Sequence, residues 1–482
     1  MTKTLTKTGG RAETSGVIPG DYALSVGNPK SPTPKGWAWK KLTDIARLET
    51  GHTPSRKHPE YWGGDVPWIG IKDATSSHGE TLQHTNQYTN DLGIQNSSAR
   101  ILPQNTVCLS RTASVGYVVV MGIPMATSQD FVNWVCDPEE LDFRFLKYVL
   151  LSEGRSFLRF ASGTTHQTIY FPEVKAFHIC LPHLDEQNAI AHILGTLDDK
   201  IELNRQMNAT LESMAQVLFK SWFVDFDPVI DNAIAAGNPV PETLQARADM
   251  RAALVDLRRP LPEAIREQFP SRFVFTEEMG WVPEGWSPAP LDQIANYKNG
   301  LALQNFRPEN DNDYLPVVKI AQLRAGYANG QEKASPNIIP GCIIDDGDVV
   351  FSWSGSLMVE IWCGGRAALN QHLFKVTSEL YPKWFYYQYT CIHLQEFQRI
   401  AADKAVTMGH IKREHLSQAT CAAPTTEILH TCSVIFEPLM SRSIKNRMEI
   451  RQLERLRDTL LPRLLSGQLR IPDAEKHLAE AI

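Results

Sequence analysis

The chain lacks the marks of a secreted, membrane-spanning or strongly basic protein. Its eight cysteines form no C-x-x-C pair, and the closest two are eleven residues apart, which argues against a zinc knuckle or a disulfide framework. This pattern favours a reducing, cytoplasmic location. No stretch is apolar enough to span a bilayer. The formal net charge is −6, so any nucleic-acid contact must be local or shared with a partner.

Motifs of catalysis are also missing. The sequence has no Asn-Pro-Pro-aromatic or Asp-Pro-Pro-Tyr methyltransferase loop, no Phe-x-Gly-x-Gly loop and no G-x-x-x-x-G-K-[ST] phosphate loop. Residues 173–175 (Glu-Val-Lys) resemble the end of a nuclease motif, but no well-placed Pro-Asp precedes them, so we interpret them as a surface strand or turn. His410 and His415 are five residues apart, which does not present two metal ligands on one helix face. We therefore predict no catalytic residue and no metal site.

What the sequence does contain is a copy of itself. Pro34, Gly36 and Trp37 recur at an offset of 249 residues as Pro283, Gly285 and Trp286. After a net loss of seven residues the offset becomes 242, and it holds from the pair Ser110 and Ser352 to the pair Leu218 and Leu460. A repeat of this length means two copies of a whole domain plus a helix, far beyond the size of solenoid repeats.

Each copy reads as a mixed α/β domain. Short β-branched and aromatic runs bounded by turn residues predict strands at 66–71, 106–109, 117–121, 315–320 and 348–353. Helical patterns follow at 143–160 and 384–400. Between the copies, residues 228–282 are rich in Ala, Pro and charge, with a short helix predicted near 243–257, and we interpret them as a linker insertion.

A long helix is predicted after each domain. The spacing of residues between 186 and 222 alternates four and three, as in a coiled coil, and the offset predicts a second seam in phase with the first. At 1.5 Å per residue each helix would run about 50 Å, so the two more naturally pair with each other than with their own domains. In an antiparallel pairing Asn204 and Asn446, which are equivalent by the repeat, would meet near the centre and fix the register.

Several runs resemble one family, the specificity subunits of type I restriction-modification enzymes. Residues 181–190 (LPHLDEQNAI), 197–201 and 218–228 (LFKSWFVDFDP) look like the central helical region of that family. Residues 460–470 look like its C-terminal repeat, and 51–55 with 66–69 look like the start of its target recognition domains. The resemblance covers nearly the whole chain.

The resemblance implies a DNA reader without catalysis of its own. Family members use two recognition domains that each read one half of a bipartite, asymmetric target, while paired helices set the unspecified spacer. Those helices dock two methyltransferase (modification) subunits, which flip and methylate adenine with S-adenosylmethionine. Motor-nuclease (restriction) subunits, which use ATP and Mg, complete the enzyme. This chain itself is then expected to bind double-stranded DNA and no cofactor.

The expected organisation follows from the repeat and the resemblance together. The fold class is α/β, with two similar target recognition domains joined by two long antiparallel coiled-coil helices in pseudo-twofold symmetry. The expected segments are a flexible arm 1–33, recognition domain 1 at 34–182, helical spacer region 1 at 183–227, the linker insertion 228–282, recognition domain 2 at 283–424, helical spacer region 2 at 425–468 and a tail 469–482.

Candidate DNA-contacting residues are polar or basic side chains in loops and at strand ends. Arg and Lys suit guanine edges and phosphates, and Gln suits adenine. Gln129 and Gln371 are equivalent by the repeat, so they are better read as framework than as readers of different bases; Trp68, Trp353 and Trp362 are better read as core. The candidates are Thr53, Ser55, Arg56, Lys57, Lys72, Arg111, Thr164, Thr165, His166, Gln167, Lys319, Gln322, Arg324, Ser354, His372, Thr407, His410 and Lys412.

Two other functions fit the sequence. A stand-alone bipartite DNA-binding regulator would bind its specific site at physiological salt without partners. A scaffold for proteins only would suit the net acidity of the chain, and its complexes would not depend on DNA.

Overall fold

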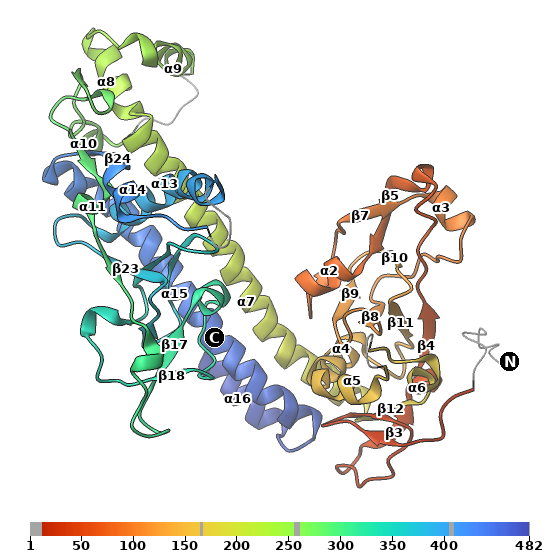
Figure 1. Ribbon diagram of the computed structural model, residues 1–482. Coiled ribbons are helices and arrows are strands. Elements are labelled where there is room, and N and C mark those ends of the chain that lie inside the picture. The colour runs from red at the N-terminus through yellow and green to blue at the C-terminus, as the bar shows by residue number, and fades with distance from the viewer. Residues whose placement is uncertain (1–11, 164–166, 255–260, 404–408, 482) are drawn as a thin grey trace. The chain divides into compact units, whose positions relative to one another are not determined.

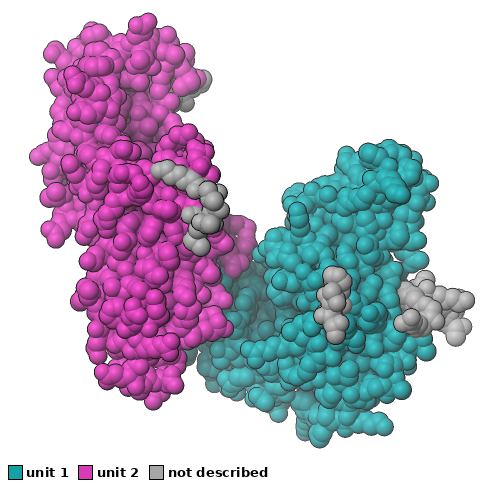
Figure 2. Space-filling view, in the orientation of Figure 1, with its two compact units in different colours: residues 1–201, 452–482 teal, residues 202–451 magenta. Residues whose placement is uncertain are grey.

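The computed structural model describes residues 12–163, 167–254, 261–403 and 409–481. The chain forms two compact units, which Figure 2 shows in different colours. Unit 1 comprises Met1–Ile201 and Gln452–Ile482, and unit 2 comprises Glu202–Arg451. Each unit thus contains one copy of the repeated domain and parts of two long helices, α7 (Leu184–Phe219) and α15 (Thr426–Leu465).

Unit 1 contains three small sheets. Their strand orders are β1-β2-β12-β3, β10-β5-β7 and β4-β11-β8-β9-β6. The strands are β1 (Ile18–Pro19), β2 (Leu24–Val26), β3 (Ala38–Lys41), β4 (Ala46–Thr50), β5 (Trp62–Ile69), β6 (Thr81–Leu82), β7 (Gln87–Thr89), β8 (Val107–Ser110), β9 (Val118–Met121), β10 (Ala126–Thr127), β11 (Phe131–Cys136) and β12 (Phe177–Leu181). The strands predicted at 66–71, 106–109 and 117–121 are confirmed as β5, β8 and β9.

The helices of the first domain are short. The helix predicted at 143–160 is present as two segments that meet at Glu153, and residues 173–175 belong to a helical turn rather than to a strand. Phe145 on α4 and Phe157 on α5 are fully buried, as is Trp134 of β11, so apolar residues hold these helices against the sheets. The segments are α1 (Leu42–Ile45), η1 (Pro59–Tyr61), α2 (Ile71–Ser76), α3 (Asp91–Gln95), α4 (Phe143–Ser152), α5 (Gly154–Phe160) and α6 (Phe171–Lys175).

The N-terminal segment corrects the expected flexible arm. β2 lies between β1 and β12, with Leu24 opposite Ile179, and Leu24 and Val26 are buried. The side chain of Glu153, itself fully buried, accepts hydrogen bonds from the backbone amides of residues 21–24 at 2.7 to 3.2 Å. Polar composition predicted disorder here, but strand pairing and this carboxylate supply the order that local sequence does not.

Unit 2 repeats much of the strand pairing of unit 1, since β16-β23-β20-β21 corresponds to β4-β11-β8-β9 and β15-β24 corresponds to β3-β12. Its strand orders are β13-β14, β15-β24, β16-β23-β20-β21 and β18-β17-β22-β19. The strands predicted at 315–320 and 348–353 are confirmed as β17 and β20. The strands are β13 (Phe273–Thr276), β14 (Gly280–Pro283), β15 (Ser287–Pro290), β16 (Asn296–Asn299), β17 (Leu315–Val318), β18 (Lys333–Ala334), β19 (Ile343–Ile344), β20 (Val349–Ser352), β21 (Met358–Ile361), β22 (Ala367–Leu369), β23 (Leu373–Thr377) and β24 (Thr420–Ala423).

The core of unit 2 is rich in aromatic rings. Phe219, near the end of α7, packs against Trp384 and Phe385 of α13 with ring centroids 6.1 and 5.8 Å apart. The helix predicted at 384–400 is confirmed as α13, and the one predicted near 243–257 as α9. The helical segments are α8 (Asp227–Ala236), α9 (Glu242–Ala253), α10 (Glu263–Arg266), α11 (Leu291–Ile294), η4 (Leu303–Asn305), α12 (Ile320–Ala325), η5 (Pro340–Cys342), α13 (Lys383–Asp403) and α14 (Arg413–Gln418).

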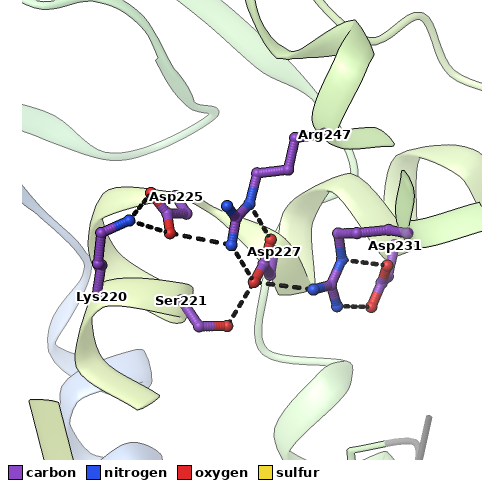
Figure 3. A network of polar contacts seen from close by, with 7 residues as sticks. Lys220, Ser221, Asp225, Asp227, Asp231 and Arg247 are labelled. Atoms are coloured by element: carbon purple, nitrogen blue, oxygen red, sulfur yellow. Dashed lines mark hydrogen bonds and ion pairs between the residues drawn. The ribbon is translucent and has the colours of Figure 1, made fainter. Parts of the chain in front are cut away.

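The insertion 228–282 is packed structure rather than a simple linker. Val229 of α8 and Phe269 are buried in the same core as Phe219. Asp227, 3% exposed, receives hydrogen bonds from Arg247 of α9 at 2.6 and 2.8 Å and from Ser221 at 2.6 Å (Figure 3). These charge-assisted bonds fasten α9 to the end of the long helix, where a π-helical turn η2 (Lys220–Val224) follows α7.

The repeat is visible in the backbone register of both units. Ala126 of β10 lies opposite Trp68 of β5 in a parallel pair, and in unit 2 Ala368 lies opposite Val317. These four positions are related by the offsets 242 and 249 found in the sequence. The two domains therefore share one framework, which confirms the predicted mixed α/β repeat.

Helices α7 and α15 pack together in antiparallel directions (Figure 1). In unit 2 Asn208 and Glu212 of α7 contact Asn446 and Ser443 of α15, so the residue numbers rise along one helix as they fall along the other. In unit 1 Asp198 bonds to Arg457 at 3.0 Å. Most of the predicted seam is buried, namely Ile190, Leu194, Leu197, Ile201, Asn204, Asn208, Trp222, Cys432, Phe436, Ser443, Asn446, Leu453, Leu460 and Leu464.

The pairing of the asparagines differs from the expectation. Asn446 donates from Nδ2 to Oδ1 of Asn208 at 3.0 Å, and not to Asn204. With Asn208 opposite Asn446, the equivalent residues that face each other at the pseudo-twofold centre are Gln206 of α7 and Met448 of α15. Asn204 and Asn446, which are also equivalent by the repeat, therefore lie on opposite sides of that centre and do not face each other. Asn204 is 1% exposed, and its Nδ2 has no hydrogen-bond partner within the described residues.

We expect opposite effects from replacing the two asparagines of α7. Asn204→Leu should stabilise the helix pair by about 1 kcal/mol because it removes a buried donor that is not paired. Asn208→Leu should destabilise it by about 1–3 kcal/mol because it leaves Asn446 without its acceptor. Denaturant unfolding of both variants, followed by helical circular dichroism, tests this. Equal destabilisation by both would contradict the assignment of the bonded pair.

The C-terminal residues 469–482, expected as a tail, contain the helix α16 (Ile471–Ala481). Its Ala474 is fully buried, and the Leu464 and Leu465 side chains that precede it are also buried. Gly467 has φ +67°, and a Cβ there would lie 2.6 Å from Cγ of Pro34. A backbone in the left-handed region against the start of the first domain requires glycine at this turn.

Within the described residues, no helix is both long and apolar enough to cross a bilayer.

Candidate nucleic-acid interface

The candidate residues are positioned by a close backbone approach that occurs in both units. A Cβ on Gly51 would clash with the carbonyl oxygen of Ser128, and one on Gly300 would clash with that of Leu369. The neighbouring backbone bonds also match: the amide of His52 donates to Thr127 O, and that of Leu301 donates to Leu369 O, both at 2.9 Å. Glycine is needed where two strands approach this closely. The loop after β4 or β16 is thereby held against the turn after β10 or β22.

In unit 1 this close backbone approach places Thr53 and Arg111 near each other, with Gln129 as their shared hydrogen-bond partner. Thr53 Oγ1 donates to the side-chain oxygen of Gln129, and Arg111 Nη2 donates to the backbone oxygen of the same residue at 3.1 Å. The guanidinium of Arg111 also lies over the ring of Phe171, 4.7 Å from its centroid. Burial lowers the pKa of Arg111, while the carboxylate of Asp130 opposes this shift, and an arginine remains charged at neutral pH. Gln129 thus connects two of the candidate residues.

A second arginine, Arg56, stacks its guanidinium group on the rings of two tryptophans. The guanidinium carbon of Arg56 is 3.6 Å from the ring centroid of Trp62 and 5.0 Å from that of Trp68, and its Nη2 donates to Gln87 Oε1 at 2.7 Å. Stacking and a fixed hydrogen bond orient the planar donor group. Arg56 itself is exposed, so part of its donor set remains open to a ligand.

The other candidates of unit 1 are exposed or lie outside the described residues. Ser55, Lys57, Lys72 and Gln167 are exposed, with Lys72 on α2 directly after β5. Gln167 precedes Thr168, whose hydroxyl lies 2.9 Å from that of Thr112, so it belongs to the Arg111 region. Thr164, Thr165 and His166 fall outside the described residues.

Unit 2 places a different set of side chains at the matching positions. Ser354 Oγ lies 3.1 Å from Nδ1 of His372, and the ring of Trp353 lies 5.9 Å from that of His372 and 6.3 Å from that of His410. Trp353 is half-buried, and its Nε1 has no hydrogen-bond partner in the part of the chain that the structure describes. This cluster is aromatic and imidazole-rich where unit 1 has arginine.

The remaining candidates of unit 2 form no single cluster. Lys319 precedes α12 and pairs with Glu332 at 2.5 Å, while its backbone amide donates to Gln322 Oε1 at 3.3 Å. Arg324, in the last turn of α12, is exposed. Lys412 precedes α14 and lies 3.4 Å from Glu414. Thr407 lies outside the described residues.

The two clusters occupy equivalent places on one framework. The amide of Ile169 donates to Arg111 O at 2.8 Å, and the amide of Ile411 donates to Trp353 O at 3.0 Å. Equivalent backbone hydrogen bonds therefore hold equivalent segments together in the two clusters. The offset of 242 pairs Arg111 with Trp353, Asp130 with His372 and Thr168 with His410. Equivalent positions thus carry side chains of different hydrogen-bonding character.

Sequence reasoning missed Trp62, Gln87 and Asp130, which hold or face the two arginines. A signal was available, because the offset of 249 places Asp311 at the position of Trp62, so the two halves differ there within an otherwise matching stretch. The reading of Trp68 and Trp362 as core is confirmed, since they are 6% and 1% exposed. Trp353 is only partly core.

The described residues contain no group of three or more His, Cys, Asp or Glu side chains able to hold a metal ion. All eight cysteines are free thiols, and burial raises the pKa of the Cys136 thiol to about 12. Arginine, hydroxyl, amide and imidazole groups on strand-end loops suit hydrogen bonding to bases and phosphates.

Comparison with known proteins agrees with this chemistry. The chain matches the family described as "Type I restriction modification DNA specificity domain" over residues 34–213 and 283–455. It is 26% identical to the type I restriction enzyme MjaIX specificity subunit of Methanocaldococcus jannaschii over 91% of this chain and 95% of that one. It is also 26% identical to the HindI specificity subunit of Haemophilus influenzae over 67% of this chain and 74% of that one.

A solved structure shares the fold. The S subunit of a type I restriction-modification system from M. genitalium superimposes with a TM-score of 0.51 at 15% sequence identity, covering 90% of this chain and 98% of that one. The duplicated framework, the paired helices and the two family matches lead to one conclusion. The chain belongs to the type I restriction-modification specificity subunits, the non-catalytic, DNA-binding subunits of these enzymes.

Proposed function

We propose that each recognition domain reads one half of a bipartite, asymmetric DNA target, while α7 and α15 set the spacer between the halves. The observation that carries this proposal is the pair of unlike clusters on one shared framework, built around Arg111 in unit 1 and Trp353 in unit 2. Two domains that read the same bases would be expected to repeat the polar side chains of these clusters, whereas Arg111, Asp130 and Thr168 of unit 1 are replaced by Trp353, His372 and His410 in unit 2.

We assign reading roles within each cluster by chemistry. Arg56 and Arg111 have oriented guanidinium groups and suit guanine edges, which arginine contacts with two hydrogen bonds. Ser354, His372 and His410 suit bases through single hydrogen bonds, and the exposed lysines suit phosphates. The residues proposed to contact DNA are Thr53, Ser55, Arg56, Lys57, Lys72, Arg111, Thr164, Thr165, His166, Gln167, Lys319, Gln322, Arg324, Ser354, His372, Thr407, His410 and Lys412.

The paired helices are also proposed to dock two methyltransferase subunits, which supply S-adenosylmethionine chemistry. Restriction subunits using ATP and Mg would join the same complex. Net acidity supports shared DNA binding, because a chain of charge −6 gains little affinity from phosphate contacts alone.

The test is adenine methylation in a cell that lacks other methyltransferases. Expressing this chain with a type I modification subunit from the same source should produce one methylated split motif, which single-molecule sequencing detects and which disappears when the chain is omitted. Arg111→Met should relax the preference at positions in one half of that motif only, with each lost contact weakening discrimination by about 1–3 kcal/mol. An assembled complex that methylates no split motif would contradict the proposal and favour a regulator or a scaffold.

A further inference from the structure

Three arginines of α15 connect the helix pair to the recognition domains: Arg447 and Arg451 in unit 2, where Arg451 donates to the backbone oxygens of Cys363 and Gly364, and Arg457 in unit 1. In unit 2 Arg447 Nη2 donates to Glu212 Oε1 of α7 at 2.7 Å. Its Nη1 donates to Glu360 Oε2 at 3.3 Å and to the backbone oxygen of Ile361 at 3.2 Å, both in β21 of the second domain. One guanidinium therefore joins α15, α7 and the recognition sheet.

Unit 1 has an analogous connection made of different residues. Arg457 Nη1 donates to Asp198 Oδ1 at 3.0 Å. The other oxygen of Asp198 accepts from the hydroxyl of Tyr148 at 2.7 Å and from Nζ of Lys147 at 3.3 Å, both on α4 of the first domain. Asp198 of α7 is thus the point at which both helices and the first domain meet.

The repeat accounts only for the part of the first connection that joins the two helices, because the offset of 242 pairs Arg205 with Arg447 and Glu212 with Glu454. The position 242 residues before Arg457 holds Ala215, and the position 242 residues before Glu360 holds Val118. The arginine of the unit 1 connection and the carboxylate that the second domain contributes therefore have no counterpart in the other half. The two connections share a structural role: each bonds its own domain to one position along the antiparallel helices.

The energetics favour a fixed attachment point. The side chains of Arg447 and Arg457 are 25% and 30% exposed, and burying a guanidinium is costly unless its donors are paired. Shifting either helix by one turn would move a domain by about 5.4 Å and would leave the arginine without its carboxylates. One base pair rises by about 3.4 Å, so a shift of one turn corresponds to a spacer changed by one or two base pairs.

We propose that Arg447 and Arg457 are positioning residues that determine which spacer length the protein accepts. This inference rests on the proposed bipartite function. Neither arginine is assigned to contact a base, so losing one should leave both half-site sequences unchanged. What should change is the set of spacers at which both domains reach their half-sites together.

The test uses the full chain with its modification subunit and sequences the methylated sites. Arg447→Met is expected to keep both half-site sequences and to raise methylation at spacers one base pair longer or shorter by roughly tenfold relative to wild type, the size of a typical coupling between contacting charged groups. Arg442→Met removes an exposed arginine of the same helix and should leave a single spacer.

Glu360→Gln weakens the same connection from the side of the domain and should broaden the spacer in the same direction. If Arg447→Met fails to assemble with the modification subunit, the spacers methylated by Glu360→Gln test the inference instead. A single, unchanged spacer in the assembled variants would overturn the inference. A wild-type complex without any split motif would instead overturn the proposed function, so the two failures are distinguishable.

Discussion

Replacing residues 283–424 with the matching domain of another specificity subunit should change one half of the methylated motif and leave the other half and the spacer as they were. The ends of this segment lie side by side, because β15 pairs antiparallel with β24 and Ser287 lies opposite Ala423. A domain whose two ends emerge at one edge can be exchanged without displacing the chain on either side.

The exchange must preserve the contacts that the domain makes with the end of α7. Trp286 stacks on Phe223 with ring centroids 5.7 Å apart, and Phe385 contacts both Phe219 and Phe223. A donor domain that keeps aromatic residues at 286, 384 and 385 should retain this core. Truncating one such ring would cost about 3–5 kcal/mol.

The expected effect of the exchange is large. Specific sites are typically bound about 10³- to 10⁷-fold more tightly than non-specific DNA, so methylation at the old motif should fall by at least about 10³-fold. The readout is the motif recovered from genome-wide adenine methylation. Exchanging residues 34–182 instead is the matched control, and it should change the opposite half. If either exchange altered both halves, the two domains would not read independently.

Glu153→Ala should strongly destabilise unit 1. The carboxylate is fully buried, and its two oxygens accept from the amides of Asp21, Tyr22, Ala23 and Leu24 and from the Ser156 hydroxyl at 2.5 Å. Removing it leaves buried backbone donors without an acceptor, which should cost about 3–5 kcal/mol. Glu153→Gln should also destabilise the unit, because its NH₂ group would face amide donors.

Hydrogen exchange is the suitable measurement, since a chain with two units need not unfold in one step. Amides of residues 21–26 should lose protection in Glu153→Ala, while amides in unit 2 keep theirs. Glu139→Ala, which removes an exposed carboxylate near the same domain, should change neither. Retained protection at residues 21–26 in the Glu153 variant would show that strand pairing alone holds this segment.

The sequence by itself determined the duplication, the helix seams and the family. Offsets of 249 and 242 residues predicted two copies of one domain, and the equivalent strand pairs β5 with β10 and β17 with β22 have the same register, because framework residues in a repeat keep the same neighbours. Alternating spacing of apolar residues likewise predicted the buried faces of α7 and α15, since helical periodicity is a local property of the chain.

Only the tertiary structure decided how distant segments combine. It joined Gln452–Ile482 to the first domain and paired Asn446 with Asn208, because packing and helix register depend on contacts far apart in the sequence. It placed Arg56 on Trp62 and ordered residues 18–26 through Glu153, where local composition had suggested a flexible arm. Side-chain partners of this kind leave no periodic signal, so they emerge only when the chain is folded.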